Sequence, residues 1–552
     1  MTETIKKTLK ESAAMRWMVL ILISGLIFST YWFQDFYGGL KGLMESELGF
    51  SSEEFGRILG LTTIANMFGM IIVGGIILDK WGVRIAGLVF GGVAVLGGVI
   101  SALASAGFFG DDHSTMLNWM IVGRVFFGSG LEVVCVVATR TVVKWFKGYE
   151  LALAMAINMG FGRLGSAMGI ALSVDIAGGQ VSTAVAFAAT LIAITLLLFV
   201  IYLVFDIKLD KQLKDGSSTS SEDEEFKFSD LIKLISNKSF LYIALLCVTF
   251  YAAVFPFINY APDLLINKFN FTGILASEGN VIMFGSKTLG NASVYVVFFI
   301  FAILFSVVPG KIADKSKRMI FIAIVFTGFI AYLYGIHTQL SLWFQNGQKT
   351  ASLIPVGTIL FTPIFGNYVD KKGKAASLMI LGALLLIFAH VSLSLFNNVY
   401  MAYAGLLSLG VAFSLVPAAM WPSVAKIVPE SRLGTAYASM FTIQNWGLGA
   451  FFWGIGALLN KVNPLVLNER LKIKESLTAQ GMNTSEILDK VIEMKEMGNY
   501  PMYDYTYPIL MLVVSGIVAI FLAFALKRAD LKQGYGLELA SSAKAPNGEN
   551  ND

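Results

Sequence analysis

Residues 75–84 read GIILDKWGVR, and residues 366–374 read GNYVDKKGK. Each stretch follows an apolar run, and both share the pattern Gly-x-x-x-Asp-Lys-x-Gly. The first glycine allows helices to pack closely and the second lets the chain turn, while the aspartate can cap the next helix or accept from an arginine across an interface. The same string at matching places indicates a chain made of two similar halves. Two unrelated tight turns are the alternative.

We expect the two strings to form a latch that holds one arrangement of the halves. Its predicted members are Gly75, Asp79, Lys80, Gly82, Arg84, Gly366, Asp370, Lys371 and Gly373.

The sequence around both strings is too apolar for a soluble protein. The 552 residues are 56% hydrophobic and 14% charged, and runs of about 20 apolar residues match the hydrocarbon core of a bilayer. The net charge of +4 is small and the basic residues gather in short loops, so nucleic-acid binding is not indicated. Cys135 and Cys247 both fall inside apolar runs and provide no disulfide framework or cysteine-based metal site. The sequence predicts an all-α polytopic membrane protein.

The pattern of apolar runs predicts about 14 transmembrane helices, six of them before a polar segment and eight after it. Twelve are expected to form two six-helix bundles, and the other two an inserted transmembrane hairpin at 292–336. The predicted spans lie near residues 16–36, 56–78, 85–107, 117–139, 150–173, 183–205, 239–262, 292–309, 319–336, 350–369, 375–396, 400–423, 435–459 and 507–527.

The polar segments predict the domain organisation. Residues 1–205 form an N-terminal six-helix bundle, and 206–238, rich in serine and acidic residues, form a flexible cytoplasmic linker. Residues 239–530 form a C-terminal bundle, which contains the hairpin and a helix-prone extracytoplasmic loop at 460–507. Residues 531–552 are predicted to be a disordered cytoplasmic tail. Lysines and arginines gather on the side of the N-terminus, which predicts that both termini are cytoplasmic.

Two charged residues sit in the middle of apolar spans, Glu132 in VGRVFFGSGLEVVCVVAT and Arg163 in LALAMAINMGFGRLGSAMGIAL. A charge near the bilayer centre costs at least about 2.5–3.5 kcal/mol, so it persists where it faces a partner or a water-filled cavity. On consecutive antiparallel helices the two residues differ in depth by about 7 Å at 1.5 Å per residue. A small zwitterion fits between them, because arginine suits a carboxylate and glutamate accepts from an ammonium. The alternative is a structural ion pair between the two.

Four further residues are candidates for the substrate site. Phe255 and Trp421 each precede a proline inside a span, and broken helices near the midplane are where carriers bind substrates. Ordinary kinks in packed helices are the alternative. Gln444 and Asn445 offer neutral donors and acceptors to a substrate, or else join neighbouring helices.

Several longer strings carry a family resemblance: GRVFFGSGLE, VKWFKGYELALAM, GFGRLGS, YAAVFPFI, AMWPSVAKIVPESRLGTAY and SMFTIQNWGLG. With the paired loop strings, the chain resembles the major facilitator superfamily outside the linker, the hairpin and the late loop. Within it, these strings are similar to the lysosomal dipeptide carriers and their bacterial relatives. The resemblance implies the major facilitator fold and a monomeric carrier of short peptides, proton-independent or proton-linked. It also places Glu132 and Arg163 at the charged ends of the substrate.

The predicted function is secondary active or facilitative transport of a small polar solute, in the first place dipeptides, by alternating access. A proton-coupled symporter of an organic anion or sugar is the main alternative. A non-transporting sensor or scaffold and an intramembrane enzyme are remote alternatives, the latter because His390 lies alone in its span. We expect no catalytic residues, no metal site and no cofactor, with a coupling proton left open.

The expected partners are the small-molecule substrate and the lipid bilayer, with no nucleic acid. The predicted location is the bacterial inner (plasma) membrane, and the lysosomal membrane is the alternative.

Overall fold

The computed structural model describes residues 8–214, 233–429 and 432–540, apart from the side chains at positions 79, 152, 213, 214, 484 and 485. In this part of the chain the elements are helices, and no β-strand is present. The first group of helices comprises α1 (Ala13–Leu48), α2 (Ser52–Leu61), α3 (Ile64–Met67), α4 (Met70–Ser105), α5 (His113–Phe146), α6 (Leu151–Ala177) and α7 (Val181–Lys214). The second comprises α9 (Lys238–Lys268), α10 (Lys287–Ser306), α11 (Lys315–Gly335), α12 (His337–Trp343), α13 (Gly347–Lys372), α14 (Ala375–Leu395), α15 (Val399–Ile427), α16 (Leu433–Val462), α17 (Val466–Ala479), α18 (Thr484–Glu496) and α19 (Thr506–Gln533).

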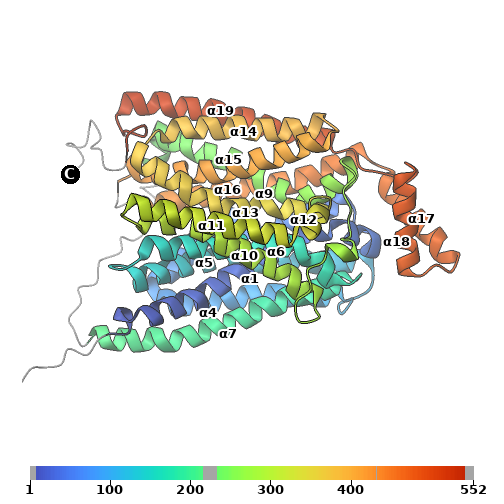
Figure 1. The fold of residues 1–552 in the computed structure, drawn as a ribbon, viewed down its shortest axis with the longest axis horizontal. Helices are drawn as coiled ribbons and strands as arrows, with labels where there is room; N and C mark the ends of the chain where they lie inside the picture. Colours follow the sequence, from blue (N-terminus) through green and yellow to red (C-terminus); the bar gives the residue numbers. More distant parts are fainter. Residues whose placement is uncertain (1–7, 215–232, 430–431, 541–552) are drawn as a thin grey trace, which may run out of the picture.

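The long helices run side by side along one direction (Figure 1). The first group occupies one side of this bundle and most of the second group the other, with α17 and α18 projecting from one end (Figure 1). We call that end the cap end, and the opposite end, where α1 begins and α19 finishes, the tail end. The all-α polytopic fold predicted from the sequence is confirmed.

Eleven helices of the described ranges are long and apolar enough to cross a membrane, or up to twelve if the bent pair α16 and α17 is one span. The predicted total of about 14 is therefore not confirmed and stays a prediction. The predicted span 150–173 coincides with α6, and the span 56–78 is divided among α2, α3 and the first part of α4.

Polar side chains fix where several helices begin. The Ser51 hydroxyl accepts from the amide of Glu54, whose carboxylate accepts from the amide of Ser51, which makes a capping box at α2. Asp112 caps α5 and Asn237 caps α9 in the same way, by accepting from backbone amides of the first turn. These caps fix the first turn of each of the three helices.

The second glycine of each repeated string turns the chain, as predicted. Gly82 has φ 75° and ψ 172°, a non-helical conformation inside α4 that separates two spans. Gly373 has φ 71° and ends α13. Both conformations are strained for residues that carry a Cβ atom.

The predicted disordered tail is wrong for residues 531–540. Helix α19 continues to Gln533, and the chain beyond it packs on the tail end with Leu537 fully buried. The Glu538 carboxylate accepts from the amide of Ser377 at 2.8 Å, and the Lys426 ammonium donates to the Leu539 carbonyl at 2.7 Å. This order arises because one apolar side chain and several backbone bonds anchor a segment that is polar in composition. Residues 541–552 of the predicted tail lie outside the described residues.

The predicted linker begins later than residue 205. Helix α7 runs on to Lys214 because Asp206 and Asp210 accept ion pairs from Arg84 and Lys144. Residues 215–232 of the linker lie outside the described residues.

The predicted hairpin corresponds to α10 and α11. Helix α10 packs on α6 and α13, with Phe299 lying against Gly160 and edge-on to Phe161. Helix α11 packs on α10 through Phe298, Phe301 and Phe329, and most of its apolar surface remains open. Such a surface suits contact with lipid.

Replacing Gly373 with alanine tests the turn after α13. A Cβ there would lie 2.4 Å from the carbonyl carbon of Leu539, and the left-handed φ adds strain. We expect Gly373→Ala to destabilise the purified protein by about 1–3 kcal/mol, seen as a lower melting temperature in detergent. Gly366→Ala is the matched control, since a Cβ at Gly366 meets nothing within 4 Å. Equal melting temperatures for the two variants would contradict the assignment.

Candidate functional site

Arg163 of α6 reaches across to the second group of helices. Its guanidinium lies 4.3 Å from the ring centroid of Phe413 on α15 and 5.7 Å from that of Phe255 on α9. A guanidinium over a ring face gains cation–π attraction, which is larger where water is excluded. Phe255 and Arg163, both predicted from the sequence, are thus brought together by the fold.

Glu132 of α5 is half-buried and interacts with the side-chain amide of Asn445 on α16. No ion pair within 4.0 Å joins Glu132 to Arg163, so the predicted alternative of a structural salt bridge is not formed in this structure. Tyr31 of α1 lies near enough to both charges to interact with each electrostatically. The two charges therefore face one region between the groups without neutralising each other directly.

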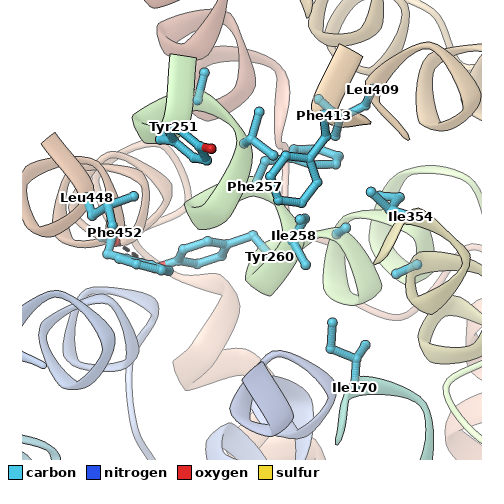
Figure 2. Close-up of a cluster of buried hydrophobic side chains, with 14 of the residues drawn as sticks. Ile170, Tyr251, Phe257, Ile258, Tyr260, Ile354, Leu409, Phe413, Leu448 and Phe452 are labelled. Carbon is cyan, nitrogen blue, oxygen red and sulfur yellow. Dashed lines mark hydrogen bonds between the residues drawn. The ribbon is translucent and has the colours of Figure 1, made fainter. Parts of the chain in front are cut away.

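An aromatic cluster of the second group lies beside Arg163. Its members are Tyr251, Phe255, Phe413, Trp421, Tyr437 and Phe441. The Trp421 indole donates to the Tyr251 hydroxyl at 3.0 Å, and its ring stacks on Phe441 with centroids 4.9 Å apart. Figure 2 shows Tyr251 on α9 and Phe413 on α15 within the neighbouring apolar core. Trp421, a candidate substrate residue from the sequence, belongs to this cluster.

Gln444 and Asn445 are neighbours on α16. Gln444 is buried and accepts from the Cys247 thiol at 3.3 Å, which joins α16 to α9. Asn445 donates to the Phe441 carbonyl one turn back at 2.9 Å, besides its interaction with Glu132. The roles of all six predicted substrate residues stay predictions, although the structure supports Gln444 more as a link between helices.

Sequence reasoning missed Phe413 and Tyr251 as neighbours of Arg163. Both lie in spans rich in apolar residues, where an aromatic side chain carries no distinguishing signal. Their position became visible only from the packing of α9 against α15.

Two of the predicted latch residues have contacts within their own group of helices. Arg84 binds Asp206 at 2.6 Å, and both belong to the first group. Asp370 acts electrostatically on Lys426 within the second group. A Cβ at Gly75 would meet nothing within 4 Å, as is also true at Gly82 and Gly366. Lys80 and Lys371 are exposed, and the side chain of Asp79 lies outside the described residues. The latch therefore stays a prediction.

Two buried ion pairs join the groups toward the cap end instead. The Lys41 ammonium of α1 lies 2.9 Å from the Asp263 carboxylate of α9, and the Lys349 ammonium of α13 lies 2.7 Å from the Asp175 carboxylate of α6. Both lysines are only 1% exposed. Removing one partner of an ion pair that is buried in this way is costly, because the other charge is left buried without compensation.

The cap takes part in the same closure. Arg470 of α17 lies 3.3 Å from the Glu45 carboxylate and donates to the Asn267 side-chain oxygen at 2.5 Å. A Cβ on Gly38 would lie 2.9 Å from the backbone of Asn259, and one on Gly456 would lie 2.2 Å from the Ser52 carbonyl. The helices of the two groups thus touch backbone to backbone, and the cap end is closed.

Two groups of long apolar helices enclose two opposite charges that do not pair with each other, an arrangement typical of membrane carriers. A family model described as Major Facilitator Superfamily matches residues 23–345, which is more than half of the chain. The chain belongs to the Major Facilitator Superfamily and is a multi-pass transporter of that family.

Among curated relatives, the lysosomal dipeptide transporter MFSD1 of Danio rerio is 26% identical over 81% of this chain and 81% of that protein. The protein of the same name from Homo sapiens is 25% identical over 82% of each chain.

Among solved structures, a bacterial homolog to the human lysosomal transporter Spinster covers 96% of this chain and 100% of its own, with a TM-score of 0.60 and 12% identity. A D-xylose–proton symporter covers 93% of this chain and 97% of its own, with a TM-score of 0.55 and 14% identity. These two likenesses concern the fold alone.

Removing the Asp175 charge tests the closure of the cap end. Asp175→Asn leaves the Lys349 ammonium buried without its carboxylate, which favours separation of α6 from α13. We expect a thiol introduced by Ser52→Cys, in protein lacking Cys135 and Cys247, to be labelled at least about fivefold faster by a water-soluble maleimide.

Asp210→Asn is the matched control, because it weakens an ion pair within the first group at the tail end. Its labelling rate should equal that of the parent protein. An unchanged rate in Asp175→Asn would show that this pair does not hold the cap end closed.

Proposed function

We propose that this transporter moves dipeptides by alternating access, with Arg163 binding the carboxylate of the peptide and Glu132 its ammonium group. The observation that carries the proposal is that these opposite charges face one region without pairing within 4.0 Å. Each instead approaches a neutral group of the other half, Phe413 for Arg163 and Asn445 for Glu132. A zwitterion bridging them would supply the missing counter-charges.

The relatives give separate support. The curated proteins similar over most of their length are named lysosomal dipeptide transporters, and the strings around Glu132 and Arg163 carry that resemblance. The aromatic cluster beside Arg163 gives apolar surface for a peptide side chain.

We further propose that the tail end faces the cytoplasm of a bacterium and that the carrier acts as a monomer. Lys527, Arg528 and Lys532 lie at that end, with most of the basic loop residues. The lysosomal membrane, named for the relatives, is the alternative location.

Blocked peptides test which residue binds which end. We expect Ala-Ala to stabilise the wild-type protein thermally, and N-acetylation or C-amidation to weaken binding by roughly 10- to 150-fold, the worth of a charge-assisted hydrogen bond of about 1.5–3 kcal/mol. In Glu132→Gln the penalty for N-acetylation should largely vanish while that for amidation remains. Arg163→Gln should show the reverse pattern, because each substitution removes one partner of one pair.

Glu493→Gln and Lys490→Gln are the matched controls, since these residues form an exposed ion pair on α18. Both controls should keep both penalties. If neither site variant changes its penalty, or if sugars or organic anions stabilise the protein and dipeptides do not, the peptide assignment is wrong and the symporter of an anion or sugar is favoured.

A further inference from the structure

Asp35 of α1 is a buried carboxylate that the proposed peptide site does not use. It is 2% exposed and lies one helical turn beyond Tyr31, on the way from the Glu132 and Arg163 region to the Lys41–Asp263 pair. It therefore stands between the substrate region and the closed cap end.

In the described part of the chain, the groups at hydrogen-bond distance from the Asp35 carboxylate are neutral. The Ser166 hydroxyl of α6 donates to one oxygen, and the Asn259 side-chain amide of α9 donates to the other at 3.1 Å. Arg163 of α6 and Arg124 of α5 act on it electrostatically, but neither forms an ion pair with it within 4.0 Å. A buried carboxylate held by neutral groups is expensive to keep charged, so a modest change around it decides whether it carries a proton.

Asn259 can serve both forms of the carboxyl group. Its Nδ2 donates to Asp35 and, at 3.3 Å, to the Phe255 carbonyl, while its Oδ1 is buried and has no hydrogen-bond partner among the described residues. If the amide turned by half a rotation, Oδ1 would face Asp35, and only a protonated carboxyl could donate to it. The unpartnered oxygen is thus a ready acceptor for a proton carried on Asp35.

Asp35 also lies at a contact that must part during transport. Asn259 belongs to the second group of helices, and its backbone touches α1 at Gly38. Opening of the cap end separates α1 from α9, which removes the Asn259 amide and leaves Ser166 as the donor from the first group. Losing a donor favours the neutral carboxyl, and closing favours the charged one.

We propose that Asp35 is a protonation site that couples peptide movement to the transfer of one proton in each transport cycle. The carboxylate takes a proton from water on the cap side when α1 and α9 separate. It releases that proton to water on the tail side after the Asn259 amide has returned. This proposal rests on the proposed transport function and adds its driving ion.

Reconstituted vesicles separate coupling from transport. Counterflow of labelled Ala-Ala needs no ion gradient, whereas accumulation above equilibrium needs a coupled ion. We expect the wild type to show both when the pH is lower on the cap side. Asp35→Asn should keep counterflow but lose accumulation, because its neutral amide cannot exchange a proton. Asp35→Glu should recover part of the accumulation, and Glu493→Gln should behave as wild type.

The outcomes bear on the two proposals separately. Wild-type counterflow without accumulation on a pH gradient, accumulation driven by sodium instead, or accumulation retained in Asp35→Asn would each overturn proton coupling and leave peptide transport standing. Absence of any dipeptide counterflow in the wild type would count against peptide transport.

A second readout does not depend on the solute. Infrared titration of the purified protein should show a protonated carboxyl band that Asp35→Asn lacks and Glu493→Gln retains. If the bands of wild type and Asp35→Asn are identical over the titration, Asp35 is not the protonation site.

Discussion

The structure depends on one constraint. A charged side chain inside a membrane-spanning bundle must be stabilised by a nearby partner, such as an opposite charge, a hydrogen-bond acceptor or donor, or a bound solute. Arg124 illustrates the ordinary solution, because its guanidinium donates to the Phe33 carbonyl at 2.8 Å and to the Thr62 hydroxyl at 2.9 Å. It is fully buried and joins α5 to α1 and α2. Glu132 and Arg163 differ, since each has only a polarisable or neutral neighbour and remains half-buried. Neither side chain has an oppositely charged partner within 4.0 Å among the described residues. A site for a charged solute requires side chains of this kind.

The cap end is held closed by close backbone contacts and by two buried ion pairs. Where glycines such as Gly38 and Gly456 bring backbones into contact, no flexible side chain lies between the two groups of helices. Under the proposed alternating access, separating the two groups at this end would break both the Lys41–Asp263 and the Lys349–Asp175 pairs. At the tail end, Gly75, Gly82 and Gly366 face open space.

Much of the fold could be predicted from the sequence, because long apolar runs dictate helices and a duplicated string marks a duplicated architecture. Glu132 and Arg163 stood out since a charge in an apolar run is rare. The cap-end ion pairs could not be predicted in this way. The apolar run of the first span ends near residue 36, so Lys41 is expected in a loop, whereas α1 continues to Leu48. Asp35 is also a charged residue within a predicted span, but it lies at the predicted end of that span near residue 36, where charged residues are common. The packed tail rests on Leu537, a single apolar residue that no pattern distinguishes.

Helix α10 of the hairpin lies beside the Lys349–Asp175 ion pair, and this position suggests what the hairpin does. Asn291 of α10 is fully buried and donates to the Asp175 carboxylate at 3.4 Å, so the hairpin covers the Lys349–Asp175 pair. Tyr295 ties α10 to α13 through a 2.7 Å hydrogen bond with Ser352, and its ring stacks on Trp343. Because these ties to the second group are stronger than the long bond to Asp175, α10 should move with α13 when α6 departs. Under the proposed alternating access, the hairpin would then stay with the Lys349 ammonium after the Asp175 carboxylate has moved away.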